Sequence, residues 1–305
     1  MGSFFSSETL QKLGLMLLTI YFSYIYQKSL RFFSSLFPLP PPWKRARIDS
    51  ILLCRAAFFP NAERLILCWD VKRMQICGLQ KLAMVDYPGK LAATVFTGGC
   101  DLRCPFCHNA LLVTRLQETP VLDEADILDF LRSRRGLLDG VVLTGGEPLI
   151  HPDAADFLQK VRDLGFCTKL DTNGRHPEAL SDILRRGLVD YVAMDIKNIP
   201  EKYPMTVGVP DLDMAPIFES IRLLRESGVD YEFRTTLVRE LHDPADIPAI
   251  GKWLKGAPHY ALQKFVDSGA LISDVPFHPF SDAEMREMAA LAEPFFGTVT
   301  MRGVD

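Results

Sequence analysis

Short apolar runs alternate with amphipathic stretches along most of this 305-residue chain, and this alternation limits the possible folds more than any other feature. The apolar runs have the length of buried strands, and the amphipathic stretches have a helical period. The predicted strands are Leu91–Phe96, Val141–Thr144, Cys167–Asp171, Tyr191–Asp195, Tyr231–Val238 and Tyr260–Phe265. The predicted helices cover residues 123–135, 153–164, 177–186, 215–227 and 244–255. Such alternation predicts an α/β fold with parallel strands.

Glycines and a capping box support these helix boundaries. Glycine follows four of the predicted helices, at Gly136, Gly165, Gly187 and Gly228, as expected of helix C-terminal caps. The sequence Ser281-Asp282-Ala283-Glu284 has the pattern of a capping box, so it predicts the start of a last helix.

Three cysteines, Cys100, Cys104 and Cys107, follow the first predicted strand and a Thr97-Gly98-Gly99 loop. Thiolates this close in sequence are typical metal ligands in a chain without a disulfide framework. Structural zinc normally takes four Cys or His ligands and an iron–sulfur cluster four thiolates, so a triplet predicts one open position. The spacing favours an iron–sulfur cluster. Zinc with His108 as its fourth ligand and unligated thiols are the alternatives.

Bulk composition limits the cellular compartments and the kinds of partner that we expect for this protein. The chain has seven cysteines, an odd number without regular spacing, which indicates a reducing compartment, and we therefore expect the protein in the cytoplasm. The net charge of -4 gives no reason to expect nucleic-acid binding. An apolar fraction of 48% is sufficient for a packed core.

Residues 1–73 differ in charge from residues 74–305. The first segment carries ten Lys or Arg against four Asp or Glu, whereas the remainder carries 24 against 34. Its uncharged span Leu13–Tyr26 is shorter than the roughly 20 residues that a transmembrane helix needs, so we do not expect a membrane protein. We predict an N-terminal extension over residues 1–73, either disordered or not natively translated, and one domain over residues 74–305. A membrane-associating anchor is the third interpretation of the extension.

Further motifs carry a resemblance to a known family. With the cysteine triplet, Gly145-Gly146-Glu147-Pro148 after the second predicted strand resembles the radical S-adenosylmethionine (SAM) superfamily. Three motifs are similar to those of glycyl-radical-enzyme activating enzymes: Cys107-His108-Asn109, Asp171-Thr172-Asn173-Gly174 and Met194-Asp195-Ile196-Lys197. The stretches Gly78–Lys81 and Asp86–Lys90 narrow the resemblance to the longer form of anaerobic ribonucleoside-triphosphate reductase activating proteins.

The resemblance implies a partial (β/α)6 barrel of parallel strands, with ligands at the carboxyl ends of the strands. It implies a [4Fe–4S] cluster on Cys100, Cys104 and Cys107, whose open iron binds SAM. The implied reaction reductively cleaves SAM to a 5′-deoxyadenosyl radical, which then removes a hydrogen from a glycine of the partner enzyme. The implied partners are the glycyl-radical subunit of anaerobic ribonucleotide reductase and a flavodoxin-like electron donor.

The residues around the cysteine triplet and the glycine pair have implied roles in SAM binding. The backbone of Gly145 and Gly146 meets the amino group of SAM, because glycine lets a ligand approach closely, and Glu147 and Pro148 fix the turn. Phe106 shields the cluster or contacts adenine. Asn109 either orients nearby backbone or has a direct functional role.

Polar residues at the later strand ends complete the implied cofactor site. Asp171, Thr172 and Asn173 offer acceptors to polar groups of the cofactor or to a cation, with an Asx-type turn as the alternative. Asp195 and Lys197 share a strand face, where the alternative is an exposed ion pair. Arg234 lies in an apolar strand and needs a partner there, which contact with the cofactor would supply.

One position departs from the pyruvate formate-lyase type of activating enzyme. Those enzymes carry a histidine in a Leu-Pro-Tyr-His context, where this chain has Leu262-Gln263-Lys264-Phe265. The resemblance implies that Gln263 takes over the contact with the adenosine portion of SAM. The departure argues against pyruvate formate-lyase as the partner.

Two other functions stay open on the sequence alone. One is a different radical SAM enzyme that modifies a small molecule or a peptide. The other is a zinc or iron–sulfur binding module without catalysis. A four-iron absorption spectrum together with SAM cleavage would separate the enzymes from the binding module.

Overall fold

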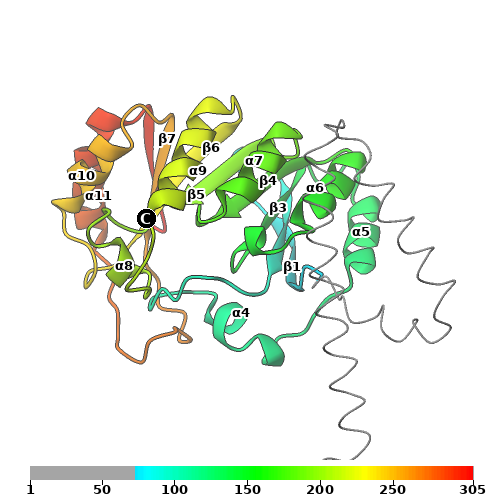
Figure 1. Cartoon of the computed structure of the whole chain (residues 1–305), viewed down its shortest axis with the longest axis horizontal. Helices are drawn as coiled ribbons and strands as arrows, with labels where there is room; N and C mark the ends of the chain where they lie inside the picture. The colour runs from blue at the N-terminus through cyan, green and yellow to red at the C-terminus, as the bar shows by residue number, and fades with distance from the viewer. Residues whose placement is uncertain (1–72, 305) are drawn as a thin grey trace, which may run out of the picture. The chain divides into compact units, whose positions relative to one another are not determined.

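The computed structural model describes residues 73–304, so the predicted extension over residues 1–73 lies outside the described residues apart from Arg73. Eight strands of the described part form one sheet, in sequence order. They are β1 Ile76–Ala83, β2 Ala92–Thr97, β3 Gly140–Gly145, β4 Cys167–Thr172, β5 Tyr191–Asp195, β6 Asp230–Leu237, β7 His259–Lys264 and β8 Thr298–Arg302. Strands β2 to β8 pair in parallel, and β1 pairs antiparallel with β2. The colour in Figure 1 therefore runs across the sheet from cyan at β1 to orange at β7.

The predicted parallel α/β fold is confirmed, and β2 to β7 are the six predicted strands. The sheet is open, because β1 and β8 are its two edges. These edge strands were not predicted. Strand β1 mixes buried and exposed residues without a period of two, and the five residues of β8 are all exposed or half-buried, so neither gives a strong strand signal.

Helices follow the strands, as predicted. They are α4 Ala110–Thr114, α5 Glu124–Ser133, α6 Ala154–Asp163, α7 Pro177–Arg185, α8 Tyr203–Thr206, α9 Ala215–Glu226, α10 Asp246–Trp253 and α11 Asp282–Ala292, with single 3₁₀ turns at η1 Leu116–Glu118, η2 Pro148–Ile150 and η3 Glu293–Phe295. Helices α4 and α8 were missed, because four or five residues are too few to show a helical period. Within residues 73–304, none of the helices is long and apolar enough to cross a membrane.

The predicted capping box and three of the four predicted glycine caps are confirmed: Gly165, Gly187 and Gly228 each follow the C-cap residue directly, whereas Gly136 lies two residues beyond the C-cap of α5. Gly136, Gly165, Gly187 and Gly228 all have positive φ angles, between 63° and 91°, which an L side chain rarely adopts. Ser281 accepts a hydrogen bond from the backbone N–H of Glu284, and the Glu284 carboxylate accepts one from the backbone N–H of Ser281. These reciprocal bonds satisfy two backbone donors at the start of α11.

The two faces of the sheet bury different kinds of side chain. On β3, Val141 and Leu143 belong to the main core beneath the helices, whereas Val142 belongs to a separate small cluster. That cluster contains Tyr87, Ala92, Val142, Tyr191 and Ala193. Val142 therefore points to the face opposite the main core, and the small apolar cluster lies on that face.

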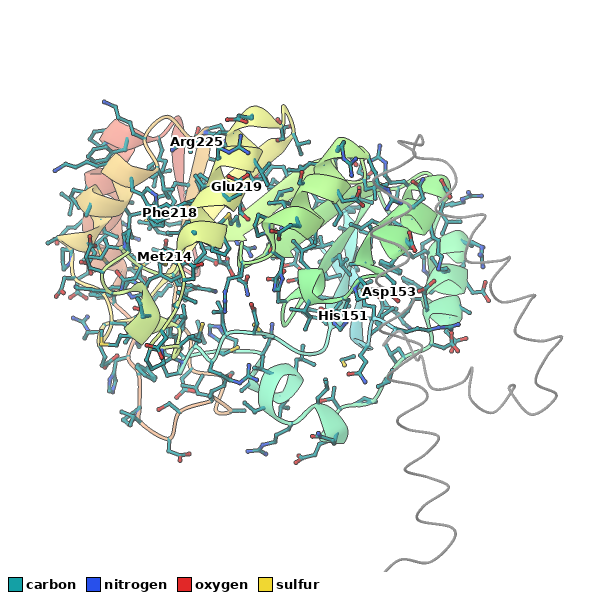
Figure 2. The ribbon with its side chains drawn as sticks, viewed as in Figure 1. His151, Asp153, Met214, Phe218, Glu219 and Arg225 are labelled. Carbon is teal, nitrogen blue, oxygen red and sulfur yellow. The ribbon has the colours of Figure 1, made fainter. Side chains whose placement is uncertain are left out.

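Contacts between helices hold the outer layer together across the middle of the sheet. The Phe218 ring of α9 packs edge-on against Trp253 of α10, with 5.4 Å between ring centroids. Arg225 of α9 donates from Nη2 to the carbonyl oxygens of Trp253 and Lys255, at 3.4 and 3.3 Å. Figure 2 labels Phe218 and Arg225 on their helix. These contacts fix α9 against the helix that follows β6.

The capping box of α11 gives a direct test of the fold. Replacing Ser281 by Ala removes the acceptor for the Glu284 N–H, and we expect the free energy of unfolding to fall by about 1 kcal/mol. Urea denaturation of the full chain measures this change. Ser268→Ala, in the exposed loop after β7, is the control and should leave the unfolding midpoint unchanged. Equal midpoints for wild type and Ser281→Ala would contradict the capping role.

Candidate active site

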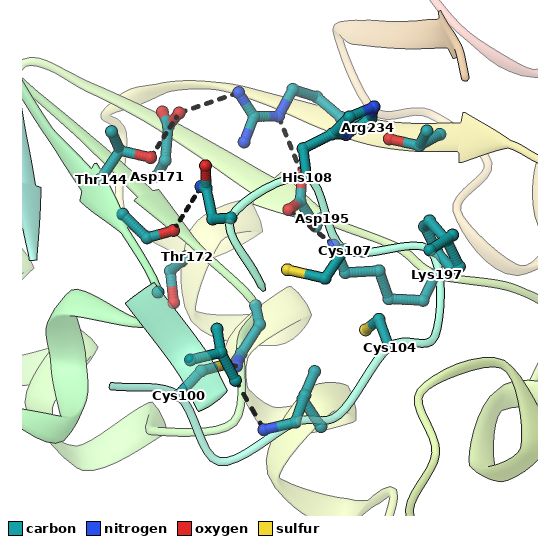
Figure 3. Close-up of a pocket in the computed structure, with 18 of the residues that line it drawn as sticks. Cys100, Cys104, Cys107, His108, Thr144, Asp171, Thr172, Asp195, Lys197 and Arg234 are labelled. Carbon is teal, nitrogen blue, oxygen red and sulfur yellow. Dashed lines mark hydrogen bonds and ion pairs between the residues drawn. The ribbon is translucent and has the colours of Figure 1, made fainter. Parts of the chain in front are cut away.

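A cavity of about 260 Å³ opens at the carboxyl ends of the parallel strands. Fourteen of the sixteen residues predicted to bind a cofactor or metal line it, and Figure 3 shows this region. They are Cys100, Cys104, Phe106, Cys107, Asn109, Gly145, Gly146, Asp171, Thr172, Asn173, Asp195, Lys197, Arg234 and Gln263. Leu102, His108, Val113, Thr144, Thr236 and Lys264 also line the cavity. The parallel register thus brings together motifs that lie far apart in sequence.

The loop after β2 carries all three cysteines along one side of the cavity. Cys104 is buried, and Cys100 and Cys107 are half-buried. The backbone N–H of Arg103 donates to the carbonyl of Val207 at 2.9 Å, which ties the loop to the segment after α8. Burial raises the pKa of Cys100 to about 12 and that of Cys104 to about 11. Such thiols stay protonated at neutral pH unless a metal takes the place of the proton.

The three thiols suit a group larger than a single ion. Among residues 73–304, no three His, Cys, Asp or Glu side chains come together in a way that could hold one metal ion. A cluster binds each thiolate through a different iron atom, so its ligands need not converge on one point. His108, the fourth ligand in the zinc alternative, directs its Nε2 to the carbonyl oxygen of Val266. The donor set therefore fits an iron–sulfur cluster better than mononuclear zinc.

The glycine pair after β3 is required by the neighbouring loop. A Cβ on Gly145 would lie 2.2 Å from the backbone nitrogen of Thr97, and a Cβ on Gly146 would lie 1.8 Å from the carbonyl oxygen of Gly99. The backbone N–H of Gly146 donates to Thr97 at 2.8 Å, and Asn109 Nδ2 donates to the Gly145 carbonyl at 2.8 Å. These glycines therefore let two backbone segments pack together, and the close approach of a ligand stays a prediction.

Glu147 and Pro148 are the two predicted residues that do not line the cavity. Both are buried, and the Glu147 carboxylate turns into the protein. It accepts from the Leu149 N–H at 3.0 Å, from Thr172 Oγ1 at 2.8 Å and from the Asn173 N–H at 2.6 Å. Glu147 therefore joins the loop after β3 to the loop after β4, and it affects the cavity through Thr172 and Asn173.

A chain of alternating charges crosses the floor of the cavity. Arg234 donates from Nη1 to Asp171 Oδ2 at 3.0 Å and from Nε to Asp195 Oδ1 at 2.9 Å. Lys197 Nζ lies 2.9 Å from Asp195 Oδ2. Although burial alone would raise the pKa of Asp195, the Arg234 guanidinium and the Lys197 ammonium hold it well below its usual range. All four groups are therefore charged at neutral pH.

For Asp195 and Lys197 the sequence left two alternatives, a place in the cofactor site or an exposed ion pair, and the structure decides against the second. Their side chains are only 25% and 16% exposed, so the pair is not the exposed ion pair that the sequence left open. Arg234 finds its partners in two carboxylates of the protein. The four side chains thus form a preorganised polar floor for the cavity.

Beside Cys100 lies a polar cluster that the sequence analysis missed. Asn173 Nδ2 lies 2.9 Å from Asp101 Oδ1 and 3.8 Å from Cys100 Sγ. Asp101 Oδ2 lies 3.2 Å from His176 Nε2 and 3.3 Å from Arg175 Nη1. His176 is half-buried, beside the Asp101 carboxylate. No spacing in the sequence connects Asp101 to His176, which lie in loops after different strands.

Another part of the cavity lining combines an aromatic side chain with polar ones. Phe106 is buried against Phe265 and Phe277, with ring centroids 6.5 Å apart in both pairs. Gln263 lines the same cavity at the end of β7 and lies 3.5 Å from Thr236 Oγ1. An aromatic face with a nearby amide is suited to a nucleobase or a sugar.

Glu147 predicts a dependence of stability on pH. Burial raises the pKa of Glu147 to about 7 in the folded protein, above the pKa of the same side chain in the unfolded chain. The folded protein is therefore destabilised by ionisation of Glu147 as the pH rises through 7. This destabilisation is absent below the pKa of Glu147 in the unfolded chain. Glu147→Gln loses the bond to the Asn173 N–H, and we expect the free energy of unfolding to fall by about 1–3 kcal/mol at low pH. The difference in the free energy of unfolding between wild type and Glu147→Gln should become smaller as the pH rises, because only wild type has the titrating carboxyl group.

Urea denaturation of both proteins on either side of neutral pH measures this gap. Glu178→Gln, at an exposed position of α7, serves as the control and should show no comparable change with pH. A gap of constant size would show that Glu147 does not titrate near neutrality.

Comparison with known proteins agrees with this geometry. The family model of the Radical SAM superfamily matches residues 94–249. A Methanocaldococcus jannaschii protein named a "putative glycyl-radical enzyme activating enzyme" is 31% identical over 75% of this chain and 96% of its own length. The pyruvate formate-lyase-activating enzyme of Listeria monocytogenes is 28% identical over 70% of this chain and 86% of its own length.

Among solved structures, SuiB of Streptococcus suis bound to S-adenosylmethionine has a similar fold, with a TM-score of 0.54 and 17% identity. The match covers 67% of this chain and 48% of SuiB, so this chain spans about half the length of that neighbour. The superfamily uses a [4Fe–4S] cluster and SAM, and the three thiols and the charged cavity suit both groups. The chain belongs to the Radical SAM superfamily and is a radical SAM enzyme.

Proposed function

We propose that this protein activates a glycyl-radical enzyme, and that its target is anaerobic ribonucleoside-triphosphate reductase. The observation that carries the proposal is the joint position of three thiols and four fixed charges around one cavity. The similarity to a protein named as a glycyl-radical enzyme activating enzyme supports the reaction class. The motifs Gly78–Lys81 and Asp86–Lys90 support the choice of the reductase.

In this proposal Cys100, Cys104 and Cys107 hold the [4Fe–4S] cluster. When bound, the cluster and SAM supply a one-electron cleavage that yields methionine and a 5′-deoxyadenosyl radical. Lys197 and Arg234 face the carboxylate of SAM, because they are the cations of the cavity floor. The protein contributes orientation and exclusion of water, since its charged groups are already fixed by one another.

The remaining cavity residues would hold the other parts of SAM. Phe106 and Gln263 lie on the wall that suits the adenosine portion. The backbone at Gly145 and Gly146 faces the amino group, and Thr172 and Asn173 offer polar contacts from the end of β4. Asn109 holds the Gly145 carbonyl and thereby keeps this backbone edge in place.

The proposed partners follow from the reaction. The target glycine must enter the cavity on a projecting loop of the reductase, because its Cα has to reach the reacting carbon. A flavodoxin-like protein supplies the electron. We assign the catalytic domain to residues 74–305 and place the reaction in the cytoplasm, in keeping with the odd number and irregular spacing of the seven cysteines.

The cluster assignment predicts the effect of losing a thiol. Replacing any one of Cys100, Cys104 or Cys107 by Ser should abolish both the four-iron absorption and reductive formation of 5′-deoxyadenosine, because a three-ligand cluster has no spare thiolate. Anaerobic reconstitution, iron analysis and product chromatography measure the two effects. Cys167→Ser, outside the cavity lining, is the matched control and should retain both. Intact 5′-deoxyadenosine formation in a triplet variant would refute the assignment.

The choice of target is tested with the reductase itself. Anaerobic incubation of the reconstituted enzyme, SAM and reduced flavodoxin with the reductase should produce a glycyl radical, seen by electron paramagnetic resonance. A reductase with Ala in place of its radical glycine is the control and should give no such signal. If SAM is cleaved but the reductase acquires no radical, the target is wrong and a small-molecule or peptide substrate takes its place.

A further inference from the structure

A lysine below the cavity has no part in the contacts predicted from the sequence. Lys169 lies in the middle of β4, and its side chain is fully buried. Its Nζ contacts Asp171 Oδ1 and lies 6.0 Å from the centroid of the Tyr191 ring. A buried ammonium is costly unless it is paired, so the Asp171 carboxylate is what makes this position tolerable.

Asp171 is held by cations at both of its oxygen atoms. Oδ1 meets Lys169, whereas Oδ2 accepts from Arg234 at 3.0 Å and from Thr144 Oγ1 at 3.3 Å. The sequence analysis left open a bound cation at Asp171. In the structure both oxygen atoms of Asp171 already have a cationic partner in the protein, and a bound cation at this residue stays a prediction.

Lys169 is also the inner end of the charge chain that forms the cavity floor. The order along the chain is Lys169, Asp171, Arg234, Asp195 and Lys197, with each charge next to one of opposite sign. Its outer four members line the cavity, and Lys169 lies beneath them.

We propose that Lys169 is a positioning residue for SAM, which acts through Asp171 to fix the Arg234 guanidinium. Without Lys169, Asp171 Oδ1 loses its partner and the carboxylate is free to turn. Arg234 then loses a fixed acceptor, and its guanidinium is less firmly oriented. The cavity floor becomes less suited to an anionic group such as the carboxylate of SAM.

This inference rests on the proposed cofactor site and is independent of which protein is the target. It predicts a defect in SAM binding that leaves the cluster intact, because Lys169 does not line the cavity that the cysteines border. A lysine that only stabilises the sheet would instead lower stability without a selective effect on SAM.

The test is a titration of the reconstituted, reduced enzyme with SAM, followed by the change that SAM causes in the electron paramagnetic resonance spectrum of the cluster. Lys169→Met keeps the length of the side chain and removes its charge. We expect its dissociation constant for SAM to rise about 10- to 100-fold. Iron content and the spectrum without SAM should match wild type. Lys160→Met, at an ion pair on the surface of α6, is the control and should bind SAM as wild type does.

A double-mutant cycle with Asp171→Asn separates positioning from simple stabilisation. If Lys169 acts through Asp171, the double variant should bind SAM no more weakly than Asp171→Asn alone, whereas independent roles would multiply the two losses. Should Lys169→Met fail to fold, the double variant still tests the coupling, because it removes the unpaired carboxylate as well.

Three results would overturn the inference: wild-type affinity in Lys169→Met, multiplied losses in the cycle, or a Lys169→Met defect confined to thermal stability. Failure of the proposed target is a separate outcome, because the titration contains no reductase. If wild type itself bound no SAM, the cofactor site would be refuted before any role of Lys169 was tested.

Discussion

Parallel pairing of consecutive strands is the constraint on which the site depends. Because β2 to β8 all run the same way, every loop that follows a strand emerges at one rim of the sheet. The cysteine loop after β2 and the glycine pair after β3 meet there, although about 40 residues of chain separate them. The cavity there also collects Asp171 of β4, Asp195 of β5 and Arg234 of β6. No single segment of the chain contains the cavity.

Burial of charge is the energetic problem that this arrangement creates, and the structure solves it by pairing. Glu147 accepts three hydrogen bonds from two neighbouring loops, so its burial also fixes those loops relative to each other. Asp171 and Asp195 share Arg234, and each has a lysine on its other oxygen. Such networks are costly to leave half-satisfied, which makes them rigid. A rigid polar floor is what a site needs if it is to orient a charged cofactor.

The fold and the chemistry rest on different kinds of evidence. The parallel sheet alone is compatible with many functions, and the likeness to SuiB at 17% identity concerns the fold only. The three thiols and the charged floor point to the cofactors. The protein on which the radical acts is a further step, since the residues of the cavity bind SAM in the proposal and the target enters from outside.

The sequence by itself determined six of the strands and their parallel direction, most of the helix caps and the cysteine triplet. Those features depend on neighbouring residues: apolar runs between amphipathic stretches, glycines after helices and thiols a few positions apart. The reason for the Gly145–Gly146 pair, the link from Asp101 to His176 and the pairing of Lys169 were decided only by the tertiary structure. Each depends on which side chains or backbone groups meet across different strands. A lysine in an apolar strand shows that a partner must exist, but only the register of β4, β5 and β6 determines which charges it joins.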